Sequence, residues 1–164
     1  MTRIIRQIFG LVLMFFSIAL FAQSDRPSCV IMKSLDLKSL LGADHDAPVP
    51  FGDESCRAES NAPGRLVILN VMEQKPAELK SWLANTRKLM VQHRAKEATI
   101  VAEPAVGPDA FSVRDRDMRS VEFYALKGSR AVVIQGSWPF RAPLNDTGIK
   151  QFQQLAKSVL DKLP

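Results

Sequence analysis

The chain has 164 residues, 46% of them hydrophobic and 24% charged, and it shows no internal repeat, low-complexity tract or acidic tail. Lys and Arg exceed Asp and Glu by 22 to 17, a net charge of +5. This excess is too small for a nucleic-acid-binding protein, whose basic residues gather on one face. The sequence contains no cluster of four or more Lys or Arg, the pattern that would indicate a membrane-surface protein.

The first two dozen residues have the layout of a secretory signal peptide. A short basic start with Arg3 and Arg6 precedes an almost wholly apolar run, and polar residues follow Ala22. The run is shorter than the roughly 20 residues that a spanning helix needs. We expect a signal peptide over residues 1–22 and a single α+β domain over residues 23–164, in the periplasm or secreted. An uncleaved anchor is the alternative.

Two cysteines, Cys29 and Cys56, lie in the expected mature domain. In an exported chain they most simply form one disulfide bond. Closing this loop stabilises a fold by about 3.6 kcal/mol on the chain-entropy model. The residues before Cys29 are not those of a lipid-modified cysteine, and no C-x-x-C pair indicates redox chemistry. We therefore expect a structural disulfide.

The first half of the domain is expected to contain a short helix, a long loop and one buried strand. Ser34 can cap a helix over residues 34–42 that a glycine ends. Residues 43–61 are rich in Asp, Pro, Gly and Ser, which predicts a loop with one short strand around Cys56. The apolar run over 66–72 does not alternate, so it predicts a central strand covered on both faces.

A long amphipathic helix is expected from Pro76 onward. Its stripe at helical spacing consists of Leu79, Trp82, Leu83, Thr86, Leu89, Met90 and His93. The basic residues outside this stripe are Lys80, Arg87, Lys88 and Arg94. A helix with one such stripe covers a single face of a sheet.

The second half is expected to consist of further strands and a final helix. The predicted strands cover residues 99–103, 111–114, 121–126 and 131–135, and residues 127–130 join the last two in a hairpin. After a loop over 138–145, Asp146 or Thr147 caps the final helix. The stripe of that helix consists of Ile149, Phe152, Leu155, Ala156, Val159, Leu160 and Leu163.

This order of elements predicts the fold class. Sequential hairpin strands imply an antiparallel sheet, and each helix with a single apolar stripe needs a sheet face to cover. The sequence therefore predicts an α+β fold, a mostly antiparallel sheet with helices packed on it as a helix–sheet–helix sandwich.

Several short segments carry a resemblance. They are residues 36–42, 55–56, 66–72, 106–111, 126–128 and 155–160. In these segments the chain resembles small exported bacterial proteins of unassigned function that have a PsbP-like α/β/α sandwich, although it lacks the lipobox of the lipoprotein members. The resemblance implies this fold and an envelope location, and it implies no activity.

The two histidines do not indicate a catalytic or metal site. His93 lies on the long helix near its end, where we interpret it as a core-edge residue or a cation near the helix C-terminus. His45 is flanked by two aspartates, and Asp53 and Glu54 follow, but no EF-hand pattern or H-x-x-x-H pair is present. The sequence contains no G-x-S-x-G nucleophile elbow, no Gly-rich phosphate-binding loop and no H-E-x-x-H zinc-protease motif. We expect no catalytic residues, metal or cofactor.

Arginines and aromatic residues near the predicted hairpin form a candidate partner-binding surface. Its members are Arg114, Arg116, Arg119, Trp138, Phe140 and Arg141. Arg and Trp are enriched at binding hot spots. The alternatives are a solvated turn with internal ion pairs, made with Asp115 and Asp117, and an aromatic loop folded onto the core.

Three classes of function stay open. The first is a non-catalytic exported envelope protein that acts as a binding or accessory module, with another envelope protein as its partner and no stable membrane insertion after signal cleavage. The second is an inhibitor or immunity-type protein that neutralises an envelope-acting toxin or hydrolase through the loop around Trp138. The third is an enzyme, for which no residue gives positive evidence. We take the first as the expectation.

Overall fold

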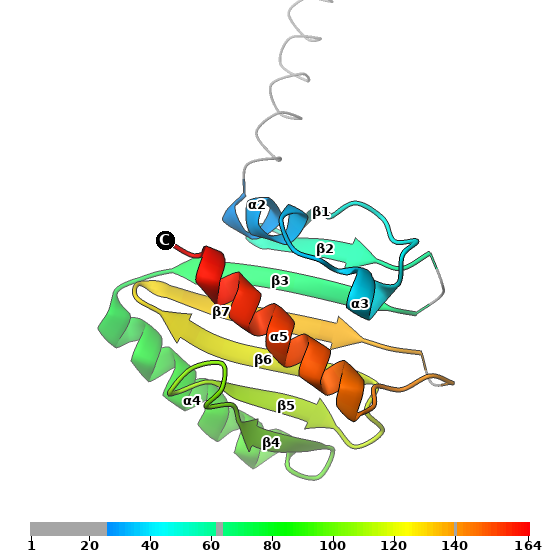
Figure 1. Ribbon diagram of the computed structural model, residues 1–164. Coiled ribbons are helices and arrows are strands. Elements are labelled where there is room, and N and C mark those ends of the chain that lie inside the picture. The colour runs from blue at the N-terminus through cyan, green and yellow to red at the C-terminus, as the bar shows by residue number, and fades with distance from the viewer. Residues whose placement is uncertain (1–25, 62–63, 140) are drawn as a thin grey trace, which may run out of the picture.

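The computed structural model describes residues 26–164 except 62–63 and 140, so the predicted signal peptide and its cleavage site lie outside the described residues. The described chain forms a seven-stranded antiparallel sheet with helices packed on it, which confirms the α+β class. The strand order is β1-β2-β3-β7-β6-β5-β4 (Figure 1). No helix in this part of the chain is both long and apolar enough to cross a membrane.

The elements follow one another along the chain with short connections. The strands are β1 (Val49–Phe51), β2 (Ser55–Glu59), β3 (Leu66–Glu73), β4 (Ala98–Ala102), β5 (Phe111–Asp115), β6 (Ser120–Lys127) and β7 (Arg130–Ser137). The helices are α2 (Pro27–Lys33), α3 (Lys38–Leu41), α4 (Pro76–Arg94) and α5 (Asp146–Lys162).

The predicted hairpin is confirmed at the centre of the sheet. β6 and β7 pair from Ser120↔Ser137 to Lys127↔Arg130, so only two residues connect them. Gly128 has a φ of 60°, the left-handed conformation that such a tight turn requires and that glycine adopts without strain. β7 also pairs along its whole length with β3, which makes it the central strand.

Helices cover both faces of the sheet. Helices α2, α3 and α5 lie on one face and α4 lies on the other (Figure 1). All seven apolar residues predicted for the stripe of α5 are buried in the larger core. In that core the rings of Phe123 and Phe152 stack at 5.7 Å, and the ring of Trp138 packs edge-on against Phe152 at 5.3 Å. The smaller core lies under α4 and contains Leu83, Phe111 and Tyr124.

The prediction that β3 is covered on both faces is wrong. Val67, Leu69 and Val71 are buried, whereas the residues between them are partly exposed. The physical reason is that α4 packs on β4, β6 and β7, so the face of β3 opposite α5 has an incomplete cover. The apolar run over residues 66–72 therefore forms a strand with one buried face and one partly exposed face.

Helix α4 begins at Pro76 as predicted, but its buried stripe is narrower than predicted. Only Leu79 and Leu83 among its residues are buried, and Trp82 and Met90 are partly buried. Leu89 is 53% exposed and His93 is exposed. His93 is therefore not a core-edge residue, because Met90 and Arg94 face the sheet at this end of the helix and Arg94 pairs with Glu122 of β6.

The N-terminal part of the fold differs most from the prediction. The helix expected over residues 34–42 is the single turn α3, and the preceding helix α2 was not expected. The hydroxyl of Ser34 donates to the carbonyl of Ile31 at 2.6 Å, so Ser34 ends α2 instead of capping a later helix. In α5 the cap is Asn145, whose side chain accepts from the amide of Gly148 at 2.9 Å.

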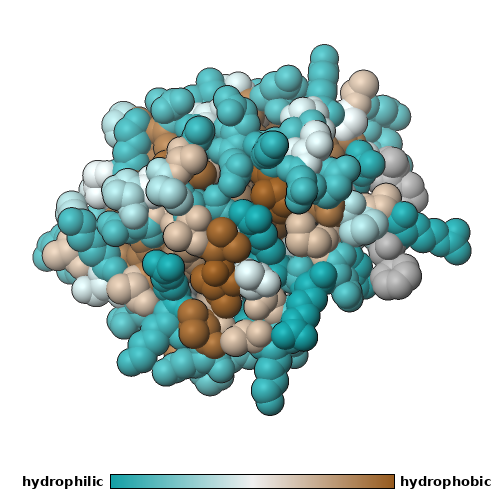
Figure 2. Space-filling view, turned by 60° about the horizontal axis from the view of Figure 1, so that its bottom comes forward, coloured by the Kyte–Doolittle hydropathy of each residue, from teal (hydrophilic) through white to brown (hydrophobic). Residues whose placement is uncertain are grey.

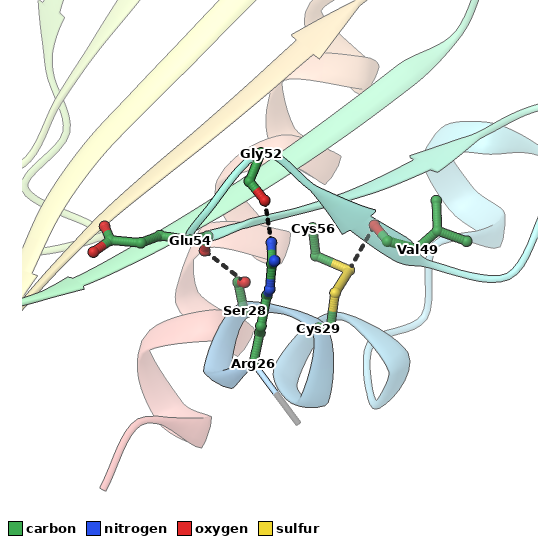
Figure 3. The surroundings of a disulfide bond; sticks show 7 residues. All are labelled: Arg26, Ser28, Cys29, Val49, Gly52, Glu54 and Cys56. Carbon is green, nitrogen blue, oxygen red and sulfur yellow. Dashed lines mark hydrogen bonds between the residues drawn. A yellow bond between two sulfur atoms is a disulfide. The ribbon is translucent and has the colours of Figure 1, made fainter. Parts of the chain in front are cut away.

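The predicted disulfide bond joins α2 to β2. Cys29 and Cys56 are bonded, and both are fully buried (Figure 3). Around this bond the Ser28 hydroxyl donates to the carbonyl of Glu54 at 2.7 Å, and Arg26 donates to the carbonyl of Gly52. The disulfide thus fastens the first described helix to the end of the sheet that carries β1 and β2.

Candidate binding groove along α4

A groove with a volume of about 690 Å³ runs between α4 and the strands beside it, and we call it the α4 groove. From α4 it is lined by Lys80, Leu83, Ala84, Arg87, Lys88 and Val91. Opposite them lie Pro108, Asp109, Phe111 and Leu126. The volume falls in the range of small-ligand sites, and the groove is open to solvent along its length.

The sequence of α4 explains the lining of the groove. Residues 80, 84, 87 and 91 follow one another at spacings of three or four positions, and residue 88 lies four positions after 84, so they share one side of the helix. This side lies next to the buried stripe of Leu79 and Leu83. The floor is apolar because alternate residues of β5 and β6, Phe111 and Leu126, point toward α4.

Three cations border this apolar floor. Lys80, Arg87 and Lys88 form no ion pair with any described residue. The guanidinium of Arg87 lies 5.9 Å from the centre of the Phe111 ring, a cation–π contact. Asp109 on the opposite wall is the single carboxylate among the lining residues. The groove therefore has an excess of positive charge.

Figure 2 shows the molecule from the side on which α4 and β4 lie in Figure 1. Hydrophobic surface runs as a broken strip through the middle of this face, and hydrophilic residues border it on all sides. An apolar strip inside a polar rim is the general form of a protein-binding or ligand-binding surface.

The loop that forms the opposite wall is held by a buried carboxylate. Glu103, at the start of this loop, is 2% exposed. One of its oxygens accepts from the hydroxyl of Ser112 at 2.6 Å and from Arg114, and the other accepts from the amide of Gln153 in α5 at 2.7 Å. A backbone hydrogen bond from the amide of Glu103 to the carbonyl of Ala110, at 2.8 Å, then closes the loop. Through Glu103, the loop that carries Asp109 is therefore linked to α5, on the other face of the sheet.

A polar cluster lies beside the groove floor, on the same face of the sheet. The ring of Phe111 stacks on that of Tyr124 at 4.7 Å. The hydroxyl of Tyr124 donates to Glu122 at 2.5 Å, and Glu122 also pairs with Arg94 at 2.5 Å. Burial raises the pKa of Tyr124, and the hydrogen bond to Glu122 raises it further. The hydrogen bond to Glu122 likewise raises the pKa of Arg94.

A second, smaller hollow of about 350 Å³ lies on the other side of α4, over the incompletely covered part of the sheet. Its lining includes Trp82, Thr86, Asn70 and Gln135. The Asn70 amide nitrogen donates to the hydroxyl of Ser55 at 3.0 Å. This hollow is smaller and more polar than the α4 groove.

The residues of the predicted partner-binding surface have different environments in the structure. Trp138 is 7% exposed and packs on Phe152, so its ring is part of the core. The expectation that this ring is presented to a partner is wrong, because the loop folds inward beside Gly136, where only a hydrogen leaves room for the indole. Arg141 is exposed, and Phe140 lies outside the described residues.

The three arginines of that prediction have different environments. Arg114 points to the α5 side, where it pairs with Glu103. Arg116 and Arg119 line a shallow hollow together with Asp115 and Asp117, in which their charges are balanced by nearby carboxylates. The carbonyl of Arg119 accepts from the backbone amide of Trp138, so this turn and the 138–144 loop are adjacent.

The two histidines lie in separate parts of the fold. The Nδ1 atom of His45 is 3.0 Å from the carbonyl of Gly42, and His93 is exposed on α4. In the parts of the chain that the structure describes, no group of three or more His, Cys, Asp or Glu side chains could hold a metal ion.

The residues of the α4 groove were not singled out from the sequence. The sequence pattern places three of them, Lys80, Arg87 and Lys88, outside the predicted apolar stripe of the helix. A signal was present, because the small Ala84 and the apolar Val91 fall on the same side of the helix as the three cations. No local sequence pattern indicates that Pro108 and Asp109 lie opposite this side of the helix.

Comparison of the chain with family models, with curated proteins and with solved structures found no match. The resemblance to PsbP-like domains thus stays a prediction.

Proposed function

We propose that this chain is a non-catalytic exported protein of the periplasm or the extracellular space, and that it binds a partner in the α4 groove. The leader-like start over residues 1–22 and the Cys29–Cys56 disulfide support export. The partner in this proposal is another envelope protein.

The observation that carries the proposal is the combination of an apolar floor with unpaired cations at its border. A cation without a carboxylate partner gains more from an anionic ligand than one that is already paired, because no internal ion pair has to be broken. Apolar surface at Ala84, Val91 and Leu126 adds a driving force for association.

The lining of the groove supports binding in preference to catalysis. Its one carboxylate is Asp109, and Ser, Cys and His are absent from its lining residues. A hydroxyl or thiol nucleophile is activated by a neighbouring base, and the lining residues offer no such pair. Lys and Arg without such a pair serve to attract and orient an anion.

The alternative is an inhibitor or immunity-type protein that neutralises an envelope-acting toxin or hydrolase. That function depends on an exposed loop around Trp138, and the burial of Trp138 in the core weakens it. A toxin or hydrolase can still be the partner, but the α4 groove would then be the contact surface.

The proposal is tested by titrating the exported protein with anilinonaphthalene sulfonate, a probe that is both apolar and anionic. The variant Ala84→Phe fills the groove, and Asn85→Phe places the same ring on an exposed position outside the lining. We expect saturable fluorescence enhancement with the native protein and with Asn85→Phe, and at least about tenfold weaker binding with Ala84→Phe. Equal binding by all three proteins, or no binding, would refute the proposal.

A further inference from the structure

The arrangement of charge along the α4 groove restricts the shape of its ligand. Lys80 and Arg87 are seven residues apart on one helix, a rise of about 10 Å, and Lys88 lies next to Arg87. The cations are therefore spread along the groove and do not gather at one end. A ligand that satisfies them needs anionic groups about two helical turns apart.

The openness of the groove restricts the ligand further. Ala84 and Val91 are exposed, and Val91 is 51% exposed. An acyl chain with one anionic head would leave much of its apolar surface in water, and it would neutralise only one end of the groove. A helical segment would place its apolar side on the floor and keep its polar side in solvent.

We infer that the occupant of the α4 groove is an acidic amphipathic helix of a partner protein, an inference that rests on the proposed function. Its apolar residues recur at i, i+3 or i+4, and i+7, and lie over the apolar surface that Ala84, Val91 and Leu126 expose in the groove. Carboxylates two turns apart pair with Lys80 and with the Arg87–Lys88 end. Asp109 on the opposite wall disfavours additional acidic residues on that side of the helix.

The test begins with selection from a phage library of random peptides on the immobilised exported protein, with counter-selection on Ala84→Phe. We expect enriched peptides to be acidic and to have apolar residues at helical spacing. The best peptide is then synthesised with a fluorophore, and its dissociation constant is measured by anisotropy. We expect the affinity to fall as salt concentration rises.

Charge reversal on matched helices provides the control. In Lys80→Glu/Lys88→Glu we expect the dissociation constant to rise by about tenfold or more. Lys150→Glu/Lys157→Glu changes the net charge equally, on two α5 lysines that are seven residues apart on the opposite face of the sheet. This control should leave binding unchanged, and a peptide with its Glu residues changed to Lys should prefer the first variant.

Several results would overturn the inference while the probe titration above still upholds groove binding. One is the absence of enriched peptides, and another is the enrichment of neutral or basic peptides, or of peptides that bind Ala84→Phe equally well. Displacement of the probe by dodecanoate but by no acidic peptide would assign the groove to an acyl anion. A change of oligomeric state in Ala84→Phe would assign it to a second copy of the chain.

Discussion

At the scale of single residues, the buried carboxylate of Glu103 connects the groove to the core. It accepts hydrogen bonds from three side chains, and these come from β5 and from α5. A buried charge is tolerated only when its partners satisfy it, and removal of one member leaves the others without a partner. Glu103 therefore determines both local stability and the position of the loop that carries Asp109.

We predict that Glu103→Ala lowers the free energy of unfolding by about 2–4 kcal/mol, because Arg114 and Ser112 lose their buried acceptor. Chemical denaturation measures this change. The exposed Glu97 supplies the control, since Glu97→Ala should change the stability by less than about 0.5 kcal/mol. Equal stabilities for the two variants would show that the Glu103 network contributes nothing.

Tyr124 gives a second prediction at this scale. It is the only tyrosine of the chain, so the near-ultraviolet absorbance of tyrosinate reports this residue alone. Because burial and the Glu122 hydrogen bond raise the pKa of Tyr124, the native protein should ionise at higher pH than the urea-unfolded chain, whose midpoint is about 10.

The same shift has a consequence for stability. A tyrosine whose pKa is raised in the folded state binds its proton more tightly there than in the unfolded chain, so the free energy of unfolding should fall as pH rises above about 10. In Tyr124→Phe this decrease should be smaller. Identical ionisation midpoints in the native and unfolded protein would contradict the assignment.

At the scale of elements, the disulfide cross-links the N-terminal helix to the sheet. Cys29 in α2 and Cys56 in β2 are separated by 27 positions in the sequence. We predict that Cys29→Ser lowers the melting temperature by about 10–15 °C, since the lost constraint is worth about 3.6 kcal/mol.

The double variant Cys29→Ser/Cys56→Ser serves as the internal control for this prediction. It should melt close to the single variant, because one substitution already removes the bond. Thiol labelling of the native exported protein should detect no free cysteine. Labelling of both cysteines without a change in melting temperature would show that the bond is dispensable.

Elements with a clear period could be predicted from the sequence, and those shaped by distant contacts could not. All seven stripe residues of α5 are buried, and the two-residue turn at Gly128 lies where turn composition placed it. For β3, the apolar run at 66–72 did not reveal that α4 covers another part of the sheet. Ser34 ended a helix that the local pattern did not predict.

The same contrast explains why the candidate site was missed. Lys80 and Arg87 belong to one helix, but the groove exists only because β4 and β5 bring the 103–110 loop opposite them. This pairing is a long-range contact that no local pattern contains. The arginines chosen from the sequence are partly paired with carboxylates, and the tryptophan chosen with them is buried.

At the scale of the whole molecule, the two faces of the sheet have different roles in this account. The face under α5 carries the larger core, whereas the face under α4 carries a narrow helix contact and the α4 groove. Because α4 buries little of its own surface, its outer side is left for contact with a partner.

The most direct test of the α4 groove is to map the probe on isotope-labelled exported protein by backbone amide chemical shifts. With anilinonaphthalene sulfonate we predict saturable shifts confined to the α4 residues of the groove, to Asp109–Phe111 and to Leu126. Saturable shifts centred on Arg116, Arg119 and Arg141, or shifts scattered over the sheet without saturation, would contradict the account.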